Sequence, residues 1–298
     1  MSDTTASLKR KISSAGDLQS VVRTMKALAA SSIGQYEQSV RALADYYRTV
    51  ELGLSVCLRQ RKEGTGTLHN TSSKSASVMS AIVFGSDQGL VGQFNDIIAD
   101  YTIKTLAELP GKPKIWAVGE RVHARLIDAG LPVTGKFLVP NSVKAITPLV
   151  AQIQIRSETQ RSNSANEDEE VYIFHNRPQS GSLYKPVSQR LLPLDDVWRQ
   201  SLVKTAWPRK TQPQVINDLS STMRPLIREY LFISLFRACA ESLASENASR
   251  LSAMQRADKN INELLEDLQS TFNRLRQSSI DEELFDVVSG YEALGGSI

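Results

Sequence analysis

A glycine-rich segment between Gly85 and Gly92 is the part of this sequence that most resembles a binding loop. It reads Gly85-Ser86-Asp87-Gln88-Gly89-Leu90-Val91-Gly92. It follows a predicted buried strand and precedes a predicted helix, a position that suits phosphate binding at a helix N-terminus. However, it has neither the Gly-x-Gly-x-x-Gly spacing of dinucleotide folds nor the Gly-Lys-Ser/Thr ending of a P-loop. A structural loop is therefore favoured over a nucleotide site, and the roles of Asp87, Gly89 and Gly92 stay open.

The other residue types that carry chemistry do not form a recognisable site. His69, His123 and His175 lie far apart, with no paired Cys or Glu at the spacing of metal ligands. No Gly-x-Ser-x-Gly elbow occurs, and no Cys or Ser stands in the context of a nucleophile. Cys57 and Cys239 each lie in an apolar helical pattern, which favours two buried thiols in a reducing compartment over a disulfide. We expect no catalytic site, no cofactor and no bound metal.

Composition and charge exclude further classes of function. The chain has 298 residues and a net charge of +3, which is too small to indicate nucleic-acid binding. Trp198, Trp207 and the basic pair Arg209-Lys210 are not interleaved on one face, so they favour ordinary surface and core. The N-terminus lacks the apolar stretch of a signal peptide, and no window reaches the roughly 18 apolar residues of a membrane span. The sequence predicts a soluble, cytoplasmic chain that reaches a membrane only through partners.

Two long helical patterns at the ends of the chain dominate its organisation. Residues 226–289 contain no glycine and no proline, between Pro225 and Gly290. As one helix of about 64 residues this run would be roughly 96 Å long, too long for a domain core, so another element must cover its apolar stripe. Residues 7–60 form a second long helical pattern. The charges of the two ends are opposite: residues 1–62 hold ten Lys and Arg against five Asp and Glu, and residues 225–298 hold seven against twelve.

The C-terminal run carries its stripe in two halves. The first half, residues 235–257, is mostly Ala and Ser, which permits close approach and suits packing against the N-terminal helix. The second half has larger aliphatic side chains. The members of the stripe are Leu235, Ala238, Ser242, Ser245, Ser249, Ser252, Ala257, Ile261, Leu264, Leu268, Leu275, Leu284 and Val287. An antiparallel coiled coil of the two ends is the economical arrangement.

Between the helical ends, strands and helices alternate. Strands are expected at 78–84, 114–118, 132–139, 171–175 and 187–192, and helices at 94–109, 120–129 and 142–160. This order indicates a small α/β domain with an at least partly parallel sheet. The predicted fold is therefore α/β plus long helices: an antiparallel coiled coil with an inserted, Rossmann-like α/β domain. The expected boundaries are 1–62 for the N-terminal helix, 63–77 for a linker, 78–208 for the α/β domain and 209–298 for the C-terminal helix.

The two ends and the glycine loop resemble the gamma subunit of F-type ATP synthases. Residues 8–12 (LKRKI) and 23–31 (RTMKALAAS) are similar to the family's L-K-x-R-I and K-x-M-x-x-V-A-A-x-K. Residues 241–250 (ESLASENASR), 254–260 (MQRADKN) and 272–280 (FNRLRQSSI) are similar to its E-x-L-A-S-E-x-A-A-R, M-x-x-A-x-x-N and Y-N-x-x-R-Q-x-x-I. Residues 188–194 (SQRLLPL) are similar to a family strand. Together these motifs span both termini in the family's order.

The resemblance implies a rotor shaft that turns inside a hexamer of alpha and beta subunits and stands, with epsilon, on the ring of c subunits. It implies a peripheral location on the cytoplasmic face of the bacterial inner membrane. The family's contacts with the catalytic ring, which is the hexamer of alpha and beta subunits, carry over to Arg276 and Gln277. The facing helix matches at Arg23, Met25 and Lys26, where core packing is the preferred role for Met25.

The sequence also departs from the family. Gln88 replaces the loop's usual Arg, Val91 replaces its Cys, and Asp281 stands where Thr or Ser is frequent, which suggests a divergent, alternate bacterial branch. Two other interpretations remain open: an α/β nucleotide-binding enzyme with helical dimerisation arms, and a coiled-coil scaffold without a rotary role.

Overall fold

The computed structural model describes residues 4–63, 79–111, 113–163, 170–179, 182–194, 196–205, 207–211, 213–216 and 218–295. The linker expected at 63–77 lies outside the described residues apart from Glu63, and so does His69. The chain divides into two compact units. We call residues 1–29 with 251–298 the helix-pair unit, and residues 30–250 the sheet unit.

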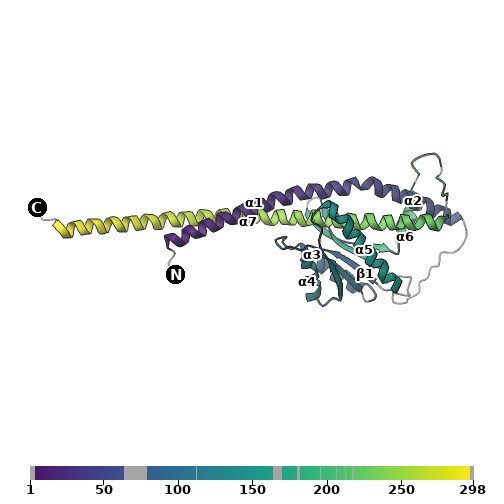
Figure 1. The fold of residues 1–298 in the computed structure, drawn as a ribbon, viewed down its shortest axis with the longest axis horizontal. Helices are drawn as coiled ribbons and strands as arrows, with labels where there is room; N and C mark the ends of the chain where they lie inside the picture. Colours follow the sequence, from purple (N-terminus) through teal and green to yellow (C-terminus); the bar gives the residue numbers. More distant parts are fainter. Residues whose placement is uncertain are drawn as a thin grey trace. The chain divides into compact units, whose positions relative to one another are not determined.

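The C-terminal helix α7 (Leu219–Gly295) is a single helix of 77 residues (Figure 1). It is longer at both ends than the run between Pro225 and Gly290. Asp218 explains the early start, because its carboxylate accepts hydrogen bonds from the backbone N–H groups of Ser220 and Ser221, both at 3.1 Å. Such a cap starts the helix ahead of the proline. A glycine costs a helix only about 1 kcal/mol relative to alanine, so Gly290 does not end it.

The N-terminal pattern forms two helices instead of one. Helix α1 (Thr5–Ala42) and helix α2 (Ala44–Glu63) are separated at Leu43. The hydrogen bonds still follow a helical pattern across the junction, since the Leu43 N–H donates to the Ser39 carbonyl at 3.2 Å and the Tyr47 N–H donates to the Leu43 carbonyl at 2.9 Å. The expectation of one uninterrupted helix over 7–60 is therefore corrected to two helices joined at a single residue.

The sheet unit contains a five-stranded sheet in the order β3-β2-β1-β4-β5. Its strands are β1 (Met79–Phe84), β2 (Pro113–Val118), β3 (Val133–Phe137), β4 (Glu170–Gln179) and β5 (Ser182–Leu192). All neighbouring strands are parallel except β4 and β5, which form an antiparallel hairpin. The predicted strands and the partly parallel sheet are confirmed.

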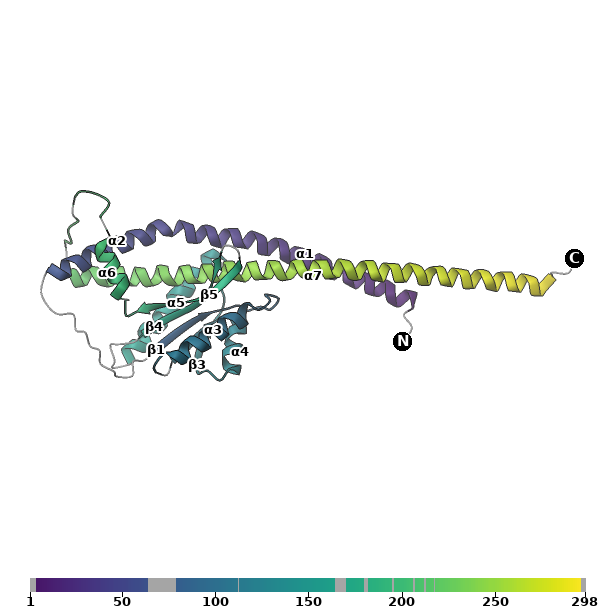
Figure 2. The same ribbon diagram turned by 180° about the vertical axis from the view of Figure 1, so that it is seen from behind.

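Helices cover both faces of the sheet (Figures 1 and 2). Helices α3 (Phe94–Glu108) and α4 (Glu120–Asp128) pack on one face, against alternate residues of β1 such as Ala81 and Val83. Helix α5 (Val143–Asn163) and the part of α7 within this unit pack on the other face, against Ile82 and Phe84. A smaller cluster joins α2, α6 (Asp196–Lys204) and the first turns of α7. Successive side chains of a strand point to opposite faces of the sheet, so neighbouring residues of β1 belong to two separate cores.

Within the helix-pair unit, α1 and α7 run antiparallel. Gln19 hydrogen-bonds Asn262, and Arg23 contacts Asp258 at 3.4 Å, so the residue number falls along α7 as it rises along α1. In this unit α1 buries every seventh residue, and these buried residues are Leu8, Ala15, Val22 and Ala29. A strict seven-residue repeat is the signature of a coiled-coil seam. The predicted coiled coil is confirmed in this unit.

Candidate functional site

The residues that matched the facing helix lie on a packed and charged seam. Met25 is half-buried and packs with Val22, Met254 and Ile261, which supports its core role. Lys26 donates through Nζ to the Asp258 carboxylate at 2.7 Å, and Arg23 donates to the other oxygen of that carboxylate at 3.4 Å. These hydrogen bonds, with that of Lys26 the strongest, lower the pKa of Asp258 below its ordinary value.

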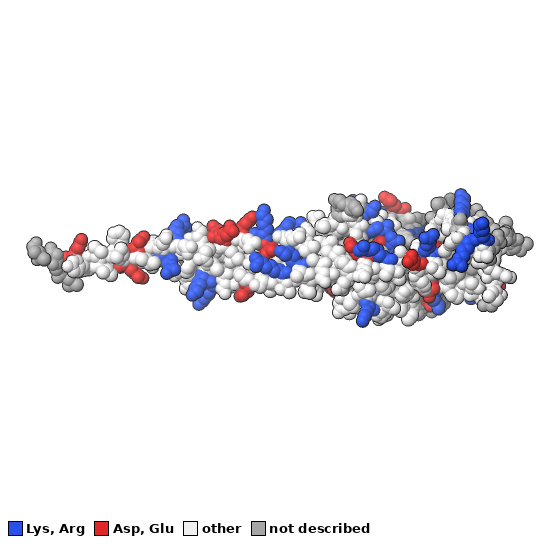
Figure 3. Space-filling model, turned by 90° about the horizontal axis from the view of Figure 1, so that it is seen from above, with Lys and Arg blue, Asp and Glu red and all other residues white. Residues whose placement is uncertain are grey.

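Asp258 is a residue that sequence reasoning missed. The opposite charges of the two ends pointed to complementary helices but not to this position. The pair with Lys26 lies at the edge of the seam, where the side chain of Asp258 is 14% exposed, and it fixes the register between the two helices. Figure 3 shows Lys and Arg side chains beside Asp and Glu side chains along α1 and α7. The chemistry of this seam is therefore that of helix pairing.

Arg276 and Gln277 occupy a different environment. Both are exposed, and neither has an ion pair or side-chain hydrogen bond within the described part of the chain. Arg276 borders a surface hollow of about 370 Å³ whose lining includes Lys9 near the start of α1 and Phe272, Ile280 and Glu283 on α7. Beyond this hollow, α7 has no covering element: every described side chain from 276 to 292 is exposed.

The exposed end of α7 is amphipathic. Its large apolar side chains include Ile280, Leu284, Val287, Val288 and Tyr291, at spacings of four, three, one and three residues. These spacings place them on one face of the helix. Phe285, also on this segment, is 71% exposed. An unpaired apolar stripe of this length favours a binding surface for another protein.

Hydrogen bonds within the chain hold the glycine loop in place. The Asp87 carboxylate accepts hydrogen bonds from the N–H of Glu120, at the first turn of α4, and from the N–H of Val139, both at 2.9 Å. The Arg121 N–H donates to the Ser86 carbonyl at 2.9 Å. The N-terminus of α4, which lies beside the loop, is thus capped by a carboxylate of the chain itself.

Helix α7 makes hydrogen bonds near the carboxyl ends of β1 and β4. Open α/β sheets bind ligands at this place, where the strand order reverses. The Ser249 hydroxyl donates to the Val91 carbonyl of the loop, and the Ser245 hydroxyl donates to the Asn176 carbonyl at 3.0 Å. The Asn176 amide donates to the Phe94 carbonyl at 3.0 Å. Ser245 and Ser249 therefore contact the α/β layer. The small residues of α7 were expected to suit packing against the N-terminal helix, and these two serines bond to the α/β layer as well.

A buried ionic cluster joins α7 to the β4–β5 hairpin. Glu241, whose side chain is 7% exposed, contacts His175, Arg177 and Arg237, each at 2.8 Å. Burial alone would raise the pKa of Glu241, but the hydrogen bonds from His175, Arg237 and Arg177 outweigh it and lower the pKa to about 2. Burial lowers the pKa of His175, so the neutral ring donates its Nε2 proton to the carboxylate. His175 was considered as a metal ligand, and its role here is structural.

Gly85 shows why this loop needs glycine. A Cβ at position 85 would lie 2.4 Å from the Val122 Cβ and 2.8 Å from the Asn95 Oδ1. We expect Gly85→Ala to lower the free energy of unfolding by about 1–3 kcal/mol, because α4 would have to move away from β1. Gly89→Ala is the matched control: its nearest neighbour is the tip of the Arg121 side chain at 3.6 Å, and the expected change is within about 0.5 kcal/mol. Urea unfolding followed by tryptophan fluorescence measures both, and equal effects would contradict the steric argument.

Two further observations concern metals and membranes. Among the described residues, no group of three or more His, Cys, Asp or Glu side chains is placed to hold a metal ion. Cys57 and Cys239 are both free and buried, as expected. No described helix combines the length and apolar character needed to cross a bilayer.

The fold and the candidate site define a class of protein in which two long antiparallel helices come from the ends of the chain and an α/β domain is inserted between them in the sequence. The model of the ATP synthase family matches residues 4–294, and the chain therefore belongs to this family. Among its curated relatives, the ATP synthase gamma chain of Syntrophus aciditrophicus is 25% identical over 295 residues, covering 96% of this chain and 97% of the relative. The ATP synthase gamma chain of Nautilia profundicola is 26% identical over 297 residues, with the same coverage.

Solved structures agree on the fold. The rotor of the Euglena gracilis mitochondrial ATP synthase matches with a TM-score of 0.60 at 16% identity, covering 93% of this chain and 98% of that chain. A chain from the central stalk and c-ring structure of the Tetrahymena thermophila mitochondrial enzyme matches with a TM-score of 0.55 at 21% identity, covering 80% and 99%. The predicted fold class and the resemblance to gamma subunits are confirmed.

Proposed function

We propose that this chain is the central-stalk rotor subunit of a rotary ATP synthase and has no catalytic site of its own. It transmits torque between a ring of c subunits and a hexamer of alpha and beta subunits, with epsilon beside it. Such a subunit works as a peripheral protein on the cytoplasmic face of a bacterial inner membrane. The gamma chains to which it is similar and the rotor fold that it shares support this role.

One observation carries the proposal furthest: the exposed end of α7 from 276 to 292 has an apolar stripe and no covering element in the described chain. A surrounding sleeve of other subunits would cover that stripe. A shaft that turns inside a sleeve needs few strong contacts at any one angle, and this segment is mostly apolar on one face. Asymmetric contacts of the shaft would then favour different conformations of the three catalytic sites of the alpha/beta hexamer.

The alternative of an α/β nucleotide-binding enzyme is less well supported. Asp87 occupies the α4 N-terminus, and the hydroxyl of Ser249 in α7 donates to the carbonyl of Val91 in the loop.

Reconstitution tests the leading proposal. Alpha and beta subunits should show little steady-state ATPase alone and full activity after addition of the chain, while the chain alone shows none. Full activity of the hexamer without the chain would contradict the rotor role, and micromolar binding of ATP to the chain alone would favour the enzyme.

Arg276→Ala and Gln277→Ala test the proposed contacts of the shaft with the catalytic ring of alpha and beta subunits. Both side chains are exposed and unpaired in the described chain, so we expect the stability to change by less than about 0.5 kcal/mol. The ATPase rate or ATP-driven ion pumping of the reconstituted complex should fall severalfold, because contacts to the ring are lost. Arg274→Ala is the matched control, since it removes the same charge from an exposed position two residues away. Equal activity of all three variants and the parent chain would remove Arg276 and Gln277 from the ring contacts.

Arg23 and Lys26 are proposed as secondary contacts with the ring. The Arg23 side chain is 58% exposed and can reach a partner while it pairs with Asp258. Lys26 is less exposed and has the shorter hydrogen bond to Asp258, so its main role is to hold α7. For Met25, we propose that it acts on the ring only by shaping the seam.

A further inference from the structure

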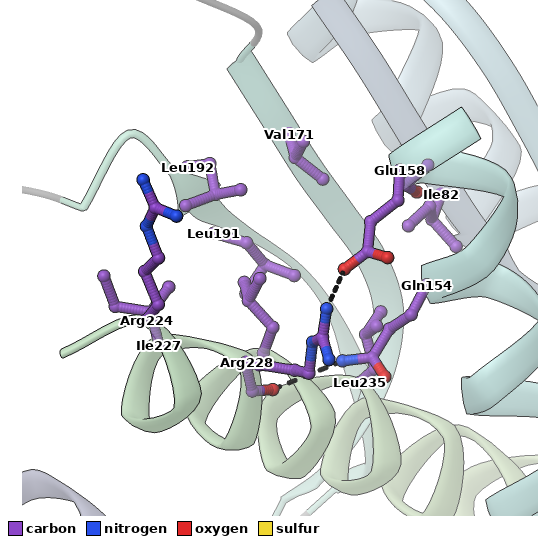
Figure 4. A pocket seen from close by; sticks show the side chains of 12 residues that line it. Ile82, Gln154, Glu158, Val171, Leu191, Leu192, Arg224, Ile227, Arg228 and Leu235 are labelled. Atoms are coloured by element: carbon purple, nitrogen blue, oxygen red, sulfur yellow. Dashed lines mark hydrogen bonds and ion pairs between the residues drawn. The ribbon is translucent and has the colours of Figure 1, made fainter. Parts of the chain in front are cut away.

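A cavity of about 280 Å³ lies within the sheet unit, between helix α5, the sheet and the first turns of α7 (Figure 4). It belongs to none of the sites described above. Its apolar lining includes Ile82, Val171, Leu191, Leu192, Ile227, Leu231 and Leu235. Water inside such a lining has few hydrogen-bond partners, whereas an apolar group would be well accommodated.

The polar residues of this cavity lie on two sides of it: Gln154, Glu158 and Arg228 on one, and Arg224, beside Leu192, on the other (Figure 4). Arg228 pairs with Glu158 at 3.0 Å, and the Gln154 amide donates to the Arg228 carbonyl at 3.3 Å. Arg224 also lines the cavity, is exposed, and has no ion pair within the described part of the chain. The three charged side chains of the lining, Glu158, Arg224 and Arg228, sum to +1. The cavity thus combines an apolar interior with a lining of net positive charge.

We propose that this cavity binds a small amphiphile with one anionic group, such as a medium-chain carboxylate. The chain of the ligand would contact Ile82, Leu191 and Leu235, and its carboxylate would pair with the free guanidinium of Arg224. Arginine suits this role because its planar donors match a carboxylate. The volume of about 280 Å³ is just below the roughly 300–1,000 Å³ of small-molecule sites, which allows a single short alkyl chain and excludes a two-chain lipid.

A bound ligand would touch three elements at once. It would contact α5 through Gln154 and Ser157, the sheet through Val171 and Leu191, and α7 through Ile227. Because it binds the folded sheet unit and not the unfolded chain, it raises the midpoint of thermal unfolding. This inference is independent of the rotor function and concerns binding alone.

Calorimetry on the full chain with octanoate as the probe tests the proposal. We expect a Kd of about 1 mM or tighter, a ligand of this size being limited in affinity by its few atoms. Octylammonium, which has the same chain and the opposite charge, should bind at least tenfold more weakly. In NMR spectra of the side-chain methyl groups, octanoate should shift the signals of Ile82 and Ile227. It should leave unchanged those of Ile98 and Ile115, which lie in the core on the opposite face of the sheet.

Two variants test separately the contacts of the ligand's carboxylate and of its alkyl group. Arg224→Gln should weaken octanoate binding about fivefold or more, while Arg209→Gln, which removes an exposed arginine outside the cavity, should leave it unchanged. Ser157→Phe places a ring in the cavity and should abolish binding of the octyl chain. The assignment is overturned if octanoate does not bind up to 10 mM (roughly tenfold above the expected Kd). It is also overturned if octylammonium binds equally well, or if Arg224→Gln and Ser157→Phe both bind octanoate like the parent chain.

Discussion

Glu241→Gln is expected to destabilise the sheet unit by about 3 kcal/mol at neutral pH. The carboxylate of Glu241 accepts hydrogen bonds from two arginines and a buried histidine, and the amide would present donors to donors. Removing one partner of a buried ion pair leaves the others uncompensated, which typically costs several kcal/mol. Arg177 and Arg237 are more than one third exposed and can regain water, which keeps the cost near the lower end of that range.

The pH dependence of this effect follows from the pKa of Glu241. The pKa is about 2 in the folded chain against an ordinary value of 4.5, so the folded state binds fewer protons than the unfolded state. The stabilisation is therefore fully present above about pH 4.5 and is lost as the pH falls toward 2. The difference in unfolding free energy between the parent chain and Glu241→Gln should be constant from pH 7 to 5 and shrink below pH 4.5.

Urea unfolding followed by tryptophan fluorescence measures this difference cleanly. Trp116, Trp198 and Trp207 are the only tryptophans of the chain, and all three belong to the sheet unit. Glu263→Gln is the control: Glu263 is exposed and pairs with Lys259 at 3.7 Å, and exposed pairs contribute about 0–1 kcal/mol. A pH-independent difference, or equal losses in the two variants, would show that the charge of Glu241 is not what joins α7 to β4.

Ile261→Asp is expected to separate the two helices of the helix-pair unit. Ile261 is 8% exposed and packs with Val22, Met25 and Met254 in the main apolar cluster of this unit. A buried carboxylate without a partner costs several kcal/mol, and a unit made of two helices has no other core to compensate. The backbone amides of residues 5–29 of α1 should then lose protection against hydrogen exchange. A complex reconstituted with this variant should also lose most of its coupled ATPase activity.

Leu264→Asp is the matched control for this substitution. Leu264 was predicted to belong to the same apolar stripe as Ile261, but its side chain is 49% exposed. The same carboxylate three residues away should change stability by less than about 1 kcal/mol, because it stays in water. Amide hydrogen exchange of residues 15–29 distinguishes the two variants. Equal protection in Ile261→Asp and the parent chain would show that this seam does not hold α1 on α7.

Much of the fold could be predicted from local patterns. The alternation of apolar and polar runs located all five strands and the helices between them, because the period of side-chain direction differs between strand and helix. The break at Leu43 could not be predicted, since no glycine or proline marks it. The start of α7 was also misplaced, because the hydrogen bonds of the Asp218 cap outweigh the usual effect of Pro225.

The candidate site was predictable only in outline. The motifs around Arg276 and Met25 pointed to the end of α7 and to the facing helix, but they did not pair Lys26 with Asp258, which lies 232 residues away. The serines of α7 were expected to serve helix packing. Ser245 and Ser249 instead bond to carbonyls of β4 and of the glycine loop. Contacts between distant segments depend on how the elements pack, and local patterns carry no information on that.

The sequence by itself determined that the chain ends in helices too long for a core, that their charges are opposite, and that an α/β domain is inserted between them. These properties depend on residue order alone, through helix propensity and apolar period. The tertiary structure decided where the long helix is covered and where it is not. Its middle is buried against the sheet by Glu241 and the serines, because hairpin β4–β5 and the glycine loop reach it. Its end beyond Arg276 stays exposed because no described element covers it. The apolar stripe on that end is where we propose that the catalytic ring of alpha and beta subunits binds.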